Sequence, residues 1–267
     1  MASGRLDGRK IFITGASSGI GLATARRFAA EGASVAGFDL QEPLDSGWDE
    51  VAAAAPKSFF MRGDVRDEEA LARFATEGAA ALGGVDGLVN SAGVGGGGPV
   101  HLVDSEEWKR VIGVNLDGTF LASKHTLPGI LESGGGSIVN IASVEGIEGF
   151  EGGSSYNASK GGVILLTRNM AMDYARKGVR VNCVCPGFIE TPLAAEVLEM
   201  EEMRSIRDRI RDAHQLGRFG KPEEVANGIL FLISSEASFV TGHALVVDGG
   251  YTTGHRFGIS EMMGLGE

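Results

Sequence analysis

The segment "KIFITGASSGIG", residues 10–21, decides the fold. Its first part, residues 10–15, is a β-branched and aromatic run that ends in glycine, which predicts a buried strand. From residue 19 to residue 32 the apolar residues recur at helical spacing up to a terminal glycine, which predicts a helix. A strand that passes through a glycine-rich turn directly into a helix is typical of nucleotide-binding α/β sheets.

Strands and helices alternate along the rest of the chain in the same way. Further strands are predicted at 33–39, 58–64, 87–93 (with its turn), 136–143, 179–187 and 243–250. Further helices are predicted at 48–55, 67–82, 105–127 (with Ser105 as its N-cap), 154–176, 191–213 and 222–234. The strands are continuous apolar runs, as in parallel sheets covered on both faces. We therefore expect an α/β fold of one domain, residues 1–267, with a doubly wound (Rossmann) parallel sheet of about seven strands and helices on both faces.

The composition narrows the classes of partner. A net charge of −11 disfavours nucleic acid. No apolar run approaches the ~20 residues that span a bilayer, and the N-terminus lacks the apolar centre of a signal peptide, so we expect a cytoplasmic protein without a membrane partner. The five histidines are scattered, so no metal site is expected. Cys183 and Cys185 are unsuited to a mutual disulfide.

The glycine-rich turn carries the prediction of a cofactor. Gly15, Gly19 and Gly21 allow a tight turn and a close approach to pyrophosphate at a helix N-terminus. The next strand ends at Asp39, 18 residues after Gly21, which is near the ~20-residue spacing of an acid that binds the ribose hydroxyls of NAD. A 2′-phosphate would meet this carboxylate, and no Arg or Lys lies in the turn or at residues 40–41. We therefore expect NAD(H) rather than NADP(H). The alternative is that the glycines only pack a turn and that Asp39 is a solvated acid. The position of the glycines between the first strand and the first helix disfavours that alternative.

Four polar residues form a candidate catalytic group. In "YNASK", Tyr156 and Lys160 are four residues apart, so a helix places them on one face. An ammonium near a phenol lowers the phenol's pKa, and a shift from ~10 toward neutrality requires about 4 kcal/mol. Ser143, at the end of the preceding strand, can donate to and accept from a substrate oxygen. Asn115 lies inside a helix, where an amide needs partners. Each residue alone has an ordinary structural explanation, but the four in this order favour catalysis.

The motifs together resemble those of the short-chain dehydrogenase/reductase family. The spacing TGxxxGxG at 14–21 and YxxxK at 156–160 is similar to the family's short form. Other family segments are resembled by "GDV" (63–65), "NSAG" (90–93, with Ser91 in place of an Asn), "PGFIET" (186–191) and "DGG" (248–250). The resemblance covers about residues 8–251.

The resemblance implies roles for particular residues. Tyr156 would be the general acid/base, Lys160 would lower its pKa and bind the nicotinamide ribose, Ser143 would hold the substrate oxygen, and Asn115 would hold a water that relays protons from Lys160 to solvent. The expected cofactor-binding residues are Gly15, Ser17, Ser18, Gly19, Ile20, Gly21, Asp39, Leu40, Asp64, Val65, Asn90, Ala92, Gly93, Tyr156, Lys160, Pro186, Gly187, Ile189 and Thr191.

The substrate is expected between three segments, 93–99, 144–155 and a lid at 191–215. The expected substrate residues are Ser143, Val144, Glu145, Phe150, Tyr156, Phe188 and Leu193, with Leu198 as a further apolar candidate. The second segment carries three glutamates and no base, which disfavours anionic substrates unless these carboxylates are merely solvated. We therefore expect a neutral or cationic, partly apolar alcohol or ketone.

The predicted function is that of an NAD(H)-dependent oxidoreductase that interconverts a secondary alcohol and a ketone. One alternative is a 3-oxoacyl-carrier-protein-type reductase, which would prefer NADPH and need a basic patch; Asp39 and the net charge of −11 argue against it. The other is a catalytically silent NAD-binding regulatory protein, which the complete group of four polar residues disfavours. The resemblance also implies a homotetramer or homodimer, with the C-terminal tail at 252–267 either reaching a neighbouring subunit or disordered.

Overall fold

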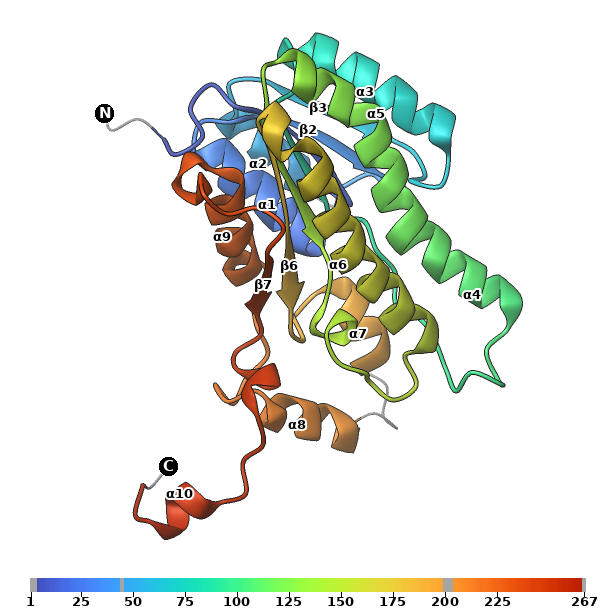
Figure 1. Ribbon diagram of the computed structural model, residues 1–267, viewed down its shortest axis with the longest axis vertical. Coiled ribbons are helices and arrows are strands. Elements are labelled where there is room, and N and C mark those ends of the chain that lie inside the picture. Colours follow the sequence, from blue (N-terminus) through green and yellow to red (C-terminus); the bar gives the residue numbers. More distant parts are fainter. Residues whose placement is uncertain (1–3, 44–45, 199–203, 266–267) are drawn as a thin grey trace.

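The strands form one parallel sheet at the centre of the molecule (Figure 1). The structure is a computed structural model that describes residues 4–43, 46–198 and 204–265, without the side chains of residues 196–198. The seven strands of this part of the chain are β1 Lys10–Thr14, β2 Ser34–Asp39, β3 Ser58–Arg62, β4 Gly87–Asn90, β5 Gly136–Ile141, β6 Val179–Pro186 and β7 Ala244–Val247. Their order is β3-β2-β1-β4-β5-β6-β7. The order reverses between β1 and β4, and in such sheets a ligand crevice opens at that point.

Helices cover both faces of the sheet, which confirms the predicted fold class. Their bounds are α1 Gly19–Ala30, α2 Gly47–Ala54, α3 Glu68–Leu82, α4 Ser105–Ile112, α5 Gly118–Glu132, α6 Ser154–Tyr174, α7 Pro192–Leu198, α8 Arg204–Ala213, α9 Pro222–Ile233 and α10 Ile259–Met262. Buried side chains of α1, α2 and α9 pack on one face. Those of α3, α5 and α6 pack on the other. The five inner strands are almost completely buried, as their continuous apolar runs predicted, whereas the edge strands β3 and β7 are only partly buried.

The segment predicted as one helix from 105 to 127 is more irregular than expected. Ser105 is the first helical residue and not the N-cap, because the Asp104 carboxylate caps the helix by accepting the Glu106 N–H at 2.6 Å. A π-helical turn, η1 Gly113–Asp117, separates α4 from α5 and has Asn115 at its centre. The amide of Asn115 binds Val94 on a neighbouring segment, an interaction that the periodicity of the helix alone does not reveal.

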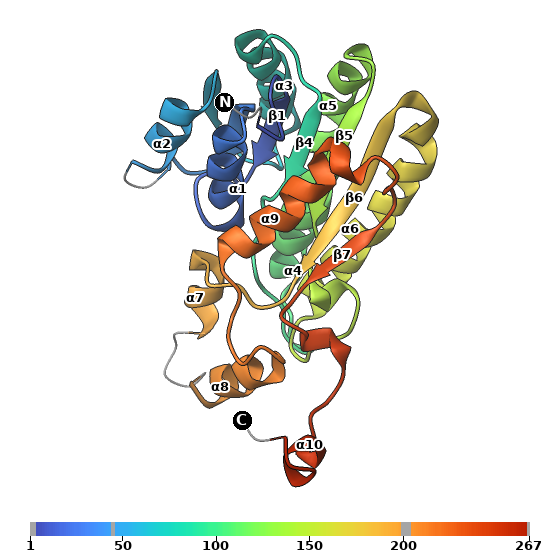
Figure 2. The same cartoon turned by 90° about the vertical axis from the view of Figure 1, so that its left-hand side faces the viewer.

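Helices α7 and α8 lie beyond the carboxyl ends of the strands, and α10 projects away from the sheet (Figure 2). The described part of the tail carries exposed apolar side chains at Phe257, Met262, Met263 and Leu265. Within the described ranges, no helix has the length and apolar character that crossing a membrane requires. The same ranges contain no group of three or more His, Cys, Asp or Glu residues arranged to hold a metal ion.

Candidate active site

The glycine-rich turn is built so that no larger residue fits. Gly15 and Gly19 have positive φ angles of 68° and 51°. A Cβ on Gly21 would lie 1.8 Å from the carbonyl oxygen of Gly15, and one on Gly15 would lie 2.6 Å from the amide nitrogen of Ala92. The helix that follows has no side-chain hydrogen bond at its N-cap, Ser18, so its first N–H groups are left without a capping side-chain acceptor. The turn therefore fits a pyrophosphate group, which the backbone could approach closely.

Asp39 lies at the end of β2, directly beside this turn. Its carboxylate accepts the N–H of Ser17 at 2.9 Å and the N–H of Gln41 at 3.1 Å. Ser17 is buried, and its backbone N–H binds Asp39. Leu40, the residue after Asp39, is 55% exposed. Arg62, which belongs to none of the sequence motifs, pairs with Asp39 in the sheet register and donates to the Leu40 carbonyl at 2.9 Å.

Four other predicted cofactor residues make contacts with the protein's own side chains and backbone. The Asp64 carboxylate is paired with Arg66 at 2.6 Å, a hydrogen-bonded ion pair that lowers the pKa of Asp64. The Val65 side chain is buried at the position that a Cβ on Gly118 would enter. The buried Asn90 amide donates to Ser123 Oγ at 3.0 Å and to Asn140 Oδ1 at 2.8 Å. Ala92 donates its N–H to Thr14 Oγ1 at 3.3 Å. None of these four residues lines the cavity that contains Tyr156 and Lys160.

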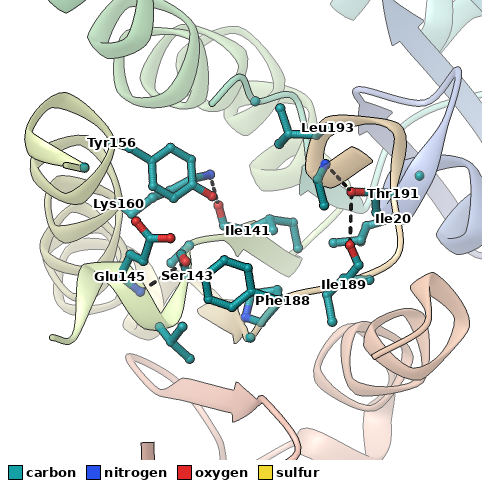
Figure 3. A pocket seen from close by; sticks show the side chains of 18 of the residues that line it. Ile20, Ile141, Ser143, Glu145, Tyr156, Lys160, Phe188, Ile189, Thr191 and Leu193 are labelled. Carbon is teal, nitrogen blue, oxygen red and sulfur yellow. Dashed lines mark hydrogen bonds between the residues drawn. The ribbon is translucent and has the colours of Figure 1, made fainter. Parts of the chain in front are cut away.

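Most of the remaining predicted residues line one cavity with a volume of about 540 Å³. From the nucleotide list these are Gly15, Ser18, Gly19, Ile20, Gly21, Gly93, Tyr156, Lys160, Pro186, Gly187, Ile189 and Thr191. The predicted substrate residues Ser143, Val144, Glu145, Phe150, Tyr156, Phe188 and Leu193 also line it (Figure 3). The cavity thus joins the glycine-rich turn to the serine, tyrosine and lysine in one continuous space.

The catalytic candidates come from β5 and α6. Ser143 follows β5, and its hydroxyl accepts the Glu145 N–H at 3.1 Å. Lys160 is almost fully buried; its ammonium donates to the Ile141 carbonyl at 2.8 Å and lies 5.6 Å from the centroid of the Tyr156 ring. In Figure 3 the Tyr156 hydroxyl points into the cavity near this ammonium.

Asn115 is close to this group but does not line the cavity. It is fully buried, and its Oδ1 accepts the Val94 N–H at 2.8 Å while its Nδ2 donates to the Val94 carbonyl at 3.0 Å and to Ser159 Oγ at 3.1 Å. A Cβ on Gly93 would lie 3.4 Å from Asn115 Oδ1 and 3.6 Å from the Lys160 ammonium, so both residues border Gly93. The amide is thus satisfied by the protein, and its role in a proton relay stays a prediction.

The electrostatics of the protein alone differ from the prediction for the phenol. Burial raises the pKa of Tyr156, the Glu145 carboxylate raises it further, and the hydrogen bond with Ser143 lowers it. Burial also lowers the pKa of Lys160 to about 8, against the opposing influence of Cys185 and Glu145. Burial therefore opposes the predicted lowering of the Tyr156 pKa by Lys160, because loss of hydration disfavours the charged phenolate. Lys160 nevertheless stays mostly charged at pH 7.

The predicted lid is held in place by a histidine that sequence analysis missed. His214, which follows α8, is buried; its Nε2 accepts the Phe188 N–H at 3.2 Å and its Nδ1 donates to the Ile210 carbonyl at 2.8 Å. Phe188 in turn packs on Phe150 and Tyr251, with both ring-centroid distances 5.6 Å. A lone histidine in a charged helical segment gave no signal of this role. Residues 199–203 of the lid and the Leu198 side chain lie outside the described residues.

Comparison with known proteins identifies the family. The model of a family described as "Enoyl-(Acyl carrier protein) reductase" matches residues 15–252. The chain is 42% identical over 254 residues to 2-(S)-hydroxypropyl-CoM dehydrogenase 3 of Xanthobacter autotrophicus, covering 94% of this chain and 99% of that protein. It is 42% identical over 250 residues to meso-2,3-butanediol dehydrogenase of Serratia marcescens, covering 93% and 96%. The solved structure of levodione reductase superposes with a TM-score of 0.89 at 35% identity, covering 94% of this chain and all of that one. The chain therefore belongs to the short-chain dehydrogenase/reductase family, as its motifs predicted.

Proposed function

We propose that this protein is an NAD(H)-dependent oxidoreductase that interconverts a secondary alcohol and a ketone, with Tyr156 as general acid/base. The observation that carries the proposal is the meeting of Ser143, Tyr156 and Lys160 in a cavity that continues to the glycine-rich turn. Two similar proteins are named as dehydrogenases of 2-(S)-hydroxypropyl-CoM and of meso-2,3-butanediol, and these names support the same reaction class.

The residues present fit a nicotinamide cofactor. The turn at Gly15–Gly21 would hold its pyrophosphate, Asp39 its adenosine ribose, Lys160 its other ribose, and Ile189 and Thr191 its nicotinamide. The chemistry supplied by a bound NAD⁺ is acceptance of a hydride from the carbinol carbon, together with a positive charge beside the phenol.

The protein's own side chains handle the substrate oxygen and its proton. Ser143 Oγ and Tyr156 Oη would hold that oxygen between them. In the oxidation direction the Tyr156 phenolate takes the hydroxyl proton, and in reduction the phenol returns it to the ketone oxygen. Burial raises the pKa of Tyr156, so positive charge beside the phenol would be needed to make it a better base. Lys160 is held close by the Ile141 carbonyl and provides part of that charge.

The preference for NAD over NADP rests on Asp39. Two backbone N–H groups hold this carboxylate beside the turn, where a 2′-phosphate would meet its negative charge. We propose NAD as the cofactor for this reason.

We also propose a homotetramer or homodimer in the cytoplasm. Phe120 on α5 and Leu165 and Met172 on α6 are exposed at 49%, 64% and 82%. These apolar side chains on neighbouring helices fit a contact between copies of the chain. The free, buried Cys183 and Cys185 fit a reducing compartment. The exposed apolar tail is proposed to reach a neighbouring subunit, which deletion of residues 256–267 would test through changes in assembly and KM.

The reaction is tested with a panel of neutral secondary alcohols and NAD⁺, followed by NADH absorbance. We expect turnover of at least one alcohol, with NADP⁺ as the poorer acceptor. The same enzyme should be assayed with a 3-oxoacyl thioester and NADPH, because the family model is described by a carrier-protein reductase. Faster turnover in that arm would replace the proposed function with the reductase alternative.

A further inference from the structure

The substrate end of the cavity contains a partly buried carboxylate, that of Glu145. This residue lies in a short 3-10 turn, η2 Val144–Gly146, and its N–H donates to Ser143 Oγ at 3.1 Å. Figure 3 shows its carboxylate on the same wall of the cavity as Ser143, Tyr156 and Lys160. A substrate oxygen held by Ser143 and Tyr156 therefore has this carboxylate beside it.

The Glu145 carboxylate has no donor of its own in the described part of the chain. No hydrogen bond or ion pair to its oxygens occurs there, and the nearby Lys160 ammonium donates to the Ile141 carbonyl instead. Burial raises the pKa of Glu145 to about 7, against the opposing charge of Lys160. A carboxylate that is partly withdrawn from water and has no protein donor can gain a hydrogen bond from a ligand that brings a donor to this point.

Much of the rest of the cavity lining is apolar. Its apolar side chains include Val144, Phe150, Phe188, Leu193 and Ile210. The other acid of the lining, Glu151, is exposed. A donor on the substrate would therefore be recognised at Glu145, while its carbon frame packs against the apolar wall.

The charges around the site select the kind of donor. An anionic substrate would be repelled by the Glu145 carboxylate. A cationic donor such as an ammonium would lie close to the charged Lys160 and to the positive ring of a bound NAD⁺, and like charges at short range are unfavourable. A neutral hydroxyl avoids both penalties and still donates a hydrogen bond to the carboxylate, which is stronger than one to a neutral acceptor.

We propose that Glu145 accepts a hydrogen bond from a second hydroxyl on the carbon next to the reacting carbinol, so that the substrates are vicinal diols and the products hydroxyketones. This inference rests on the proposed function. The reacting carbinol loses its hydride to NAD⁺ and its hydroxyl proton to Tyr156, and the second hydroxyl is unchanged.

The test compares matched alcohols that differ by one hydroxyl, cyclohexanol with cyclohexane-1,2-diol and 2-pentanol with pentane-2,3-diol. For the wild-type holoenzyme we expect kcat/KM to be about 10- to 100-fold higher for the diol, the effect of one hydrogen bond to a charged acceptor. Glu145→Leu should reduce this ratio to near one. Glu145→Gln should reduce it only in part, because its amide oxygen still accepts. Glu148→Leu, an exposed acid of the same loop, is the control and should keep the wild-type ratio.

Binding gives a second readout that does not depend on turnover. The affinity of cyclohexane-1,2-diol for the enzyme–NADH complex, measured by calorimetry, should fall about tenfold or more in Glu145→Leu. The proposal is overturned if wild-type enzyme oxidises both members of each pair equally, if Glu145→Leu lowers them by the same factor, if diol affinity is unchanged, or if 2-aminocyclohexanol is preferred to the diol. Absence of turnover with all four alcohols would instead count against the proposed function.

Discussion

Replacing Gly21 with alanine would test whether the glycine-rich turn holds the cofactor. An added Cβ would lie 1.8 Å from the Gly15 carbonyl oxygen and 2.7 Å from its carbonyl carbon. Real Cβ contacts essentially never fall below 3.0 Å, so the two segments must separate by at least 3.0 − 1.8 = 1.2 Å. Both contacts are backbone atoms, and no flexible side chain can move aside to relieve them.

A displacement of this size should affect NADH binding much more than folding. Overpacking of this kind costs about 1–3 kcal/mol of stability. A misplacement of about 1 Å costs about 100-fold in reaction rate. We expect a loss of similar size in cofactor affinity, so the NADH dissociation constant, measured by fluorescence titration, should rise about 100-fold. The far-UV circular dichroism should stay that of the wild type. Gly149→Ala is the matched control, because a Cβ there meets no atom within 4 Å. Wild-type NADH affinity in Gly21→Ala would refute the assignment of this turn to the cofactor.

Three further substitutions test charges in and beside the cavity. The pKa of Glu145 is raised from 4.5 to about 7, so its contribution to stability is present below pH 4.5 and lost as the pH rises through 7. In urea titrations over that range, the wild type should lose on the order of 3 kcal/mol of unfolding free energy relative to Glu145→Gln. A constant difference between the two proteins would contradict this. The pKa of Lys160 is lowered from 10.5 to about 8, so its stabilising effect is present above pH 10.5 and lost as the pH falls through 8. Lys160→Met should be inactive, and as the pH falls from 10.5 to 7 it should gain on the order of 3 kcal/mol of unfolding free energy relative to wild type. Parallel pH profiles of stability would be inconsistent with the buried ammonium. Asp39→Asn should lower the ratio of kcat/KM with NAD⁺ to that with NADP⁺ at least about tenfold, because it removes a charge that repels the 2′-phosphate; an unchanged ratio would remove Asp39 from cofactor selection.

Sequence patterns predicted the fold and the family because both depend on local regularities. The alternation of apolar strands and helices specifies the layered sheet, and the comparisons confirm the family and its reaction class. The patterns also predicted that Ser143, Tyr156 and Lys160 meet, since a strand end and one helix face bring them together.

Other features depend on contacts between distant segments and had no local signal. The periodicity of residues 105–127 indicates one regular helix, whereas the Asn115 amide binds Val94 and a π-helical turn interrupts it. Asn90 belongs to a family-like turn, but its side chain binds Ser123 and Asn140 inside the fold. The spacing of Tyr156 and Lys160 predicts their proximity, but it carries no information on their burial, which raises the pKa of the phenol and lowers that of the ammonium.

The role of Tyr156 is the central claim of the proposed function. The decisive measurement is the turnover of a secondary alcohol with NAD⁺ by Tyr156→Phe, with NADH affinity measured on the same sample. We expect turnover to fall by at least about 100-fold, the scale of a general acid/base, while NADH binds with nearly wild-type affinity. Near-normal kcat in this variant would contradict the mechanism.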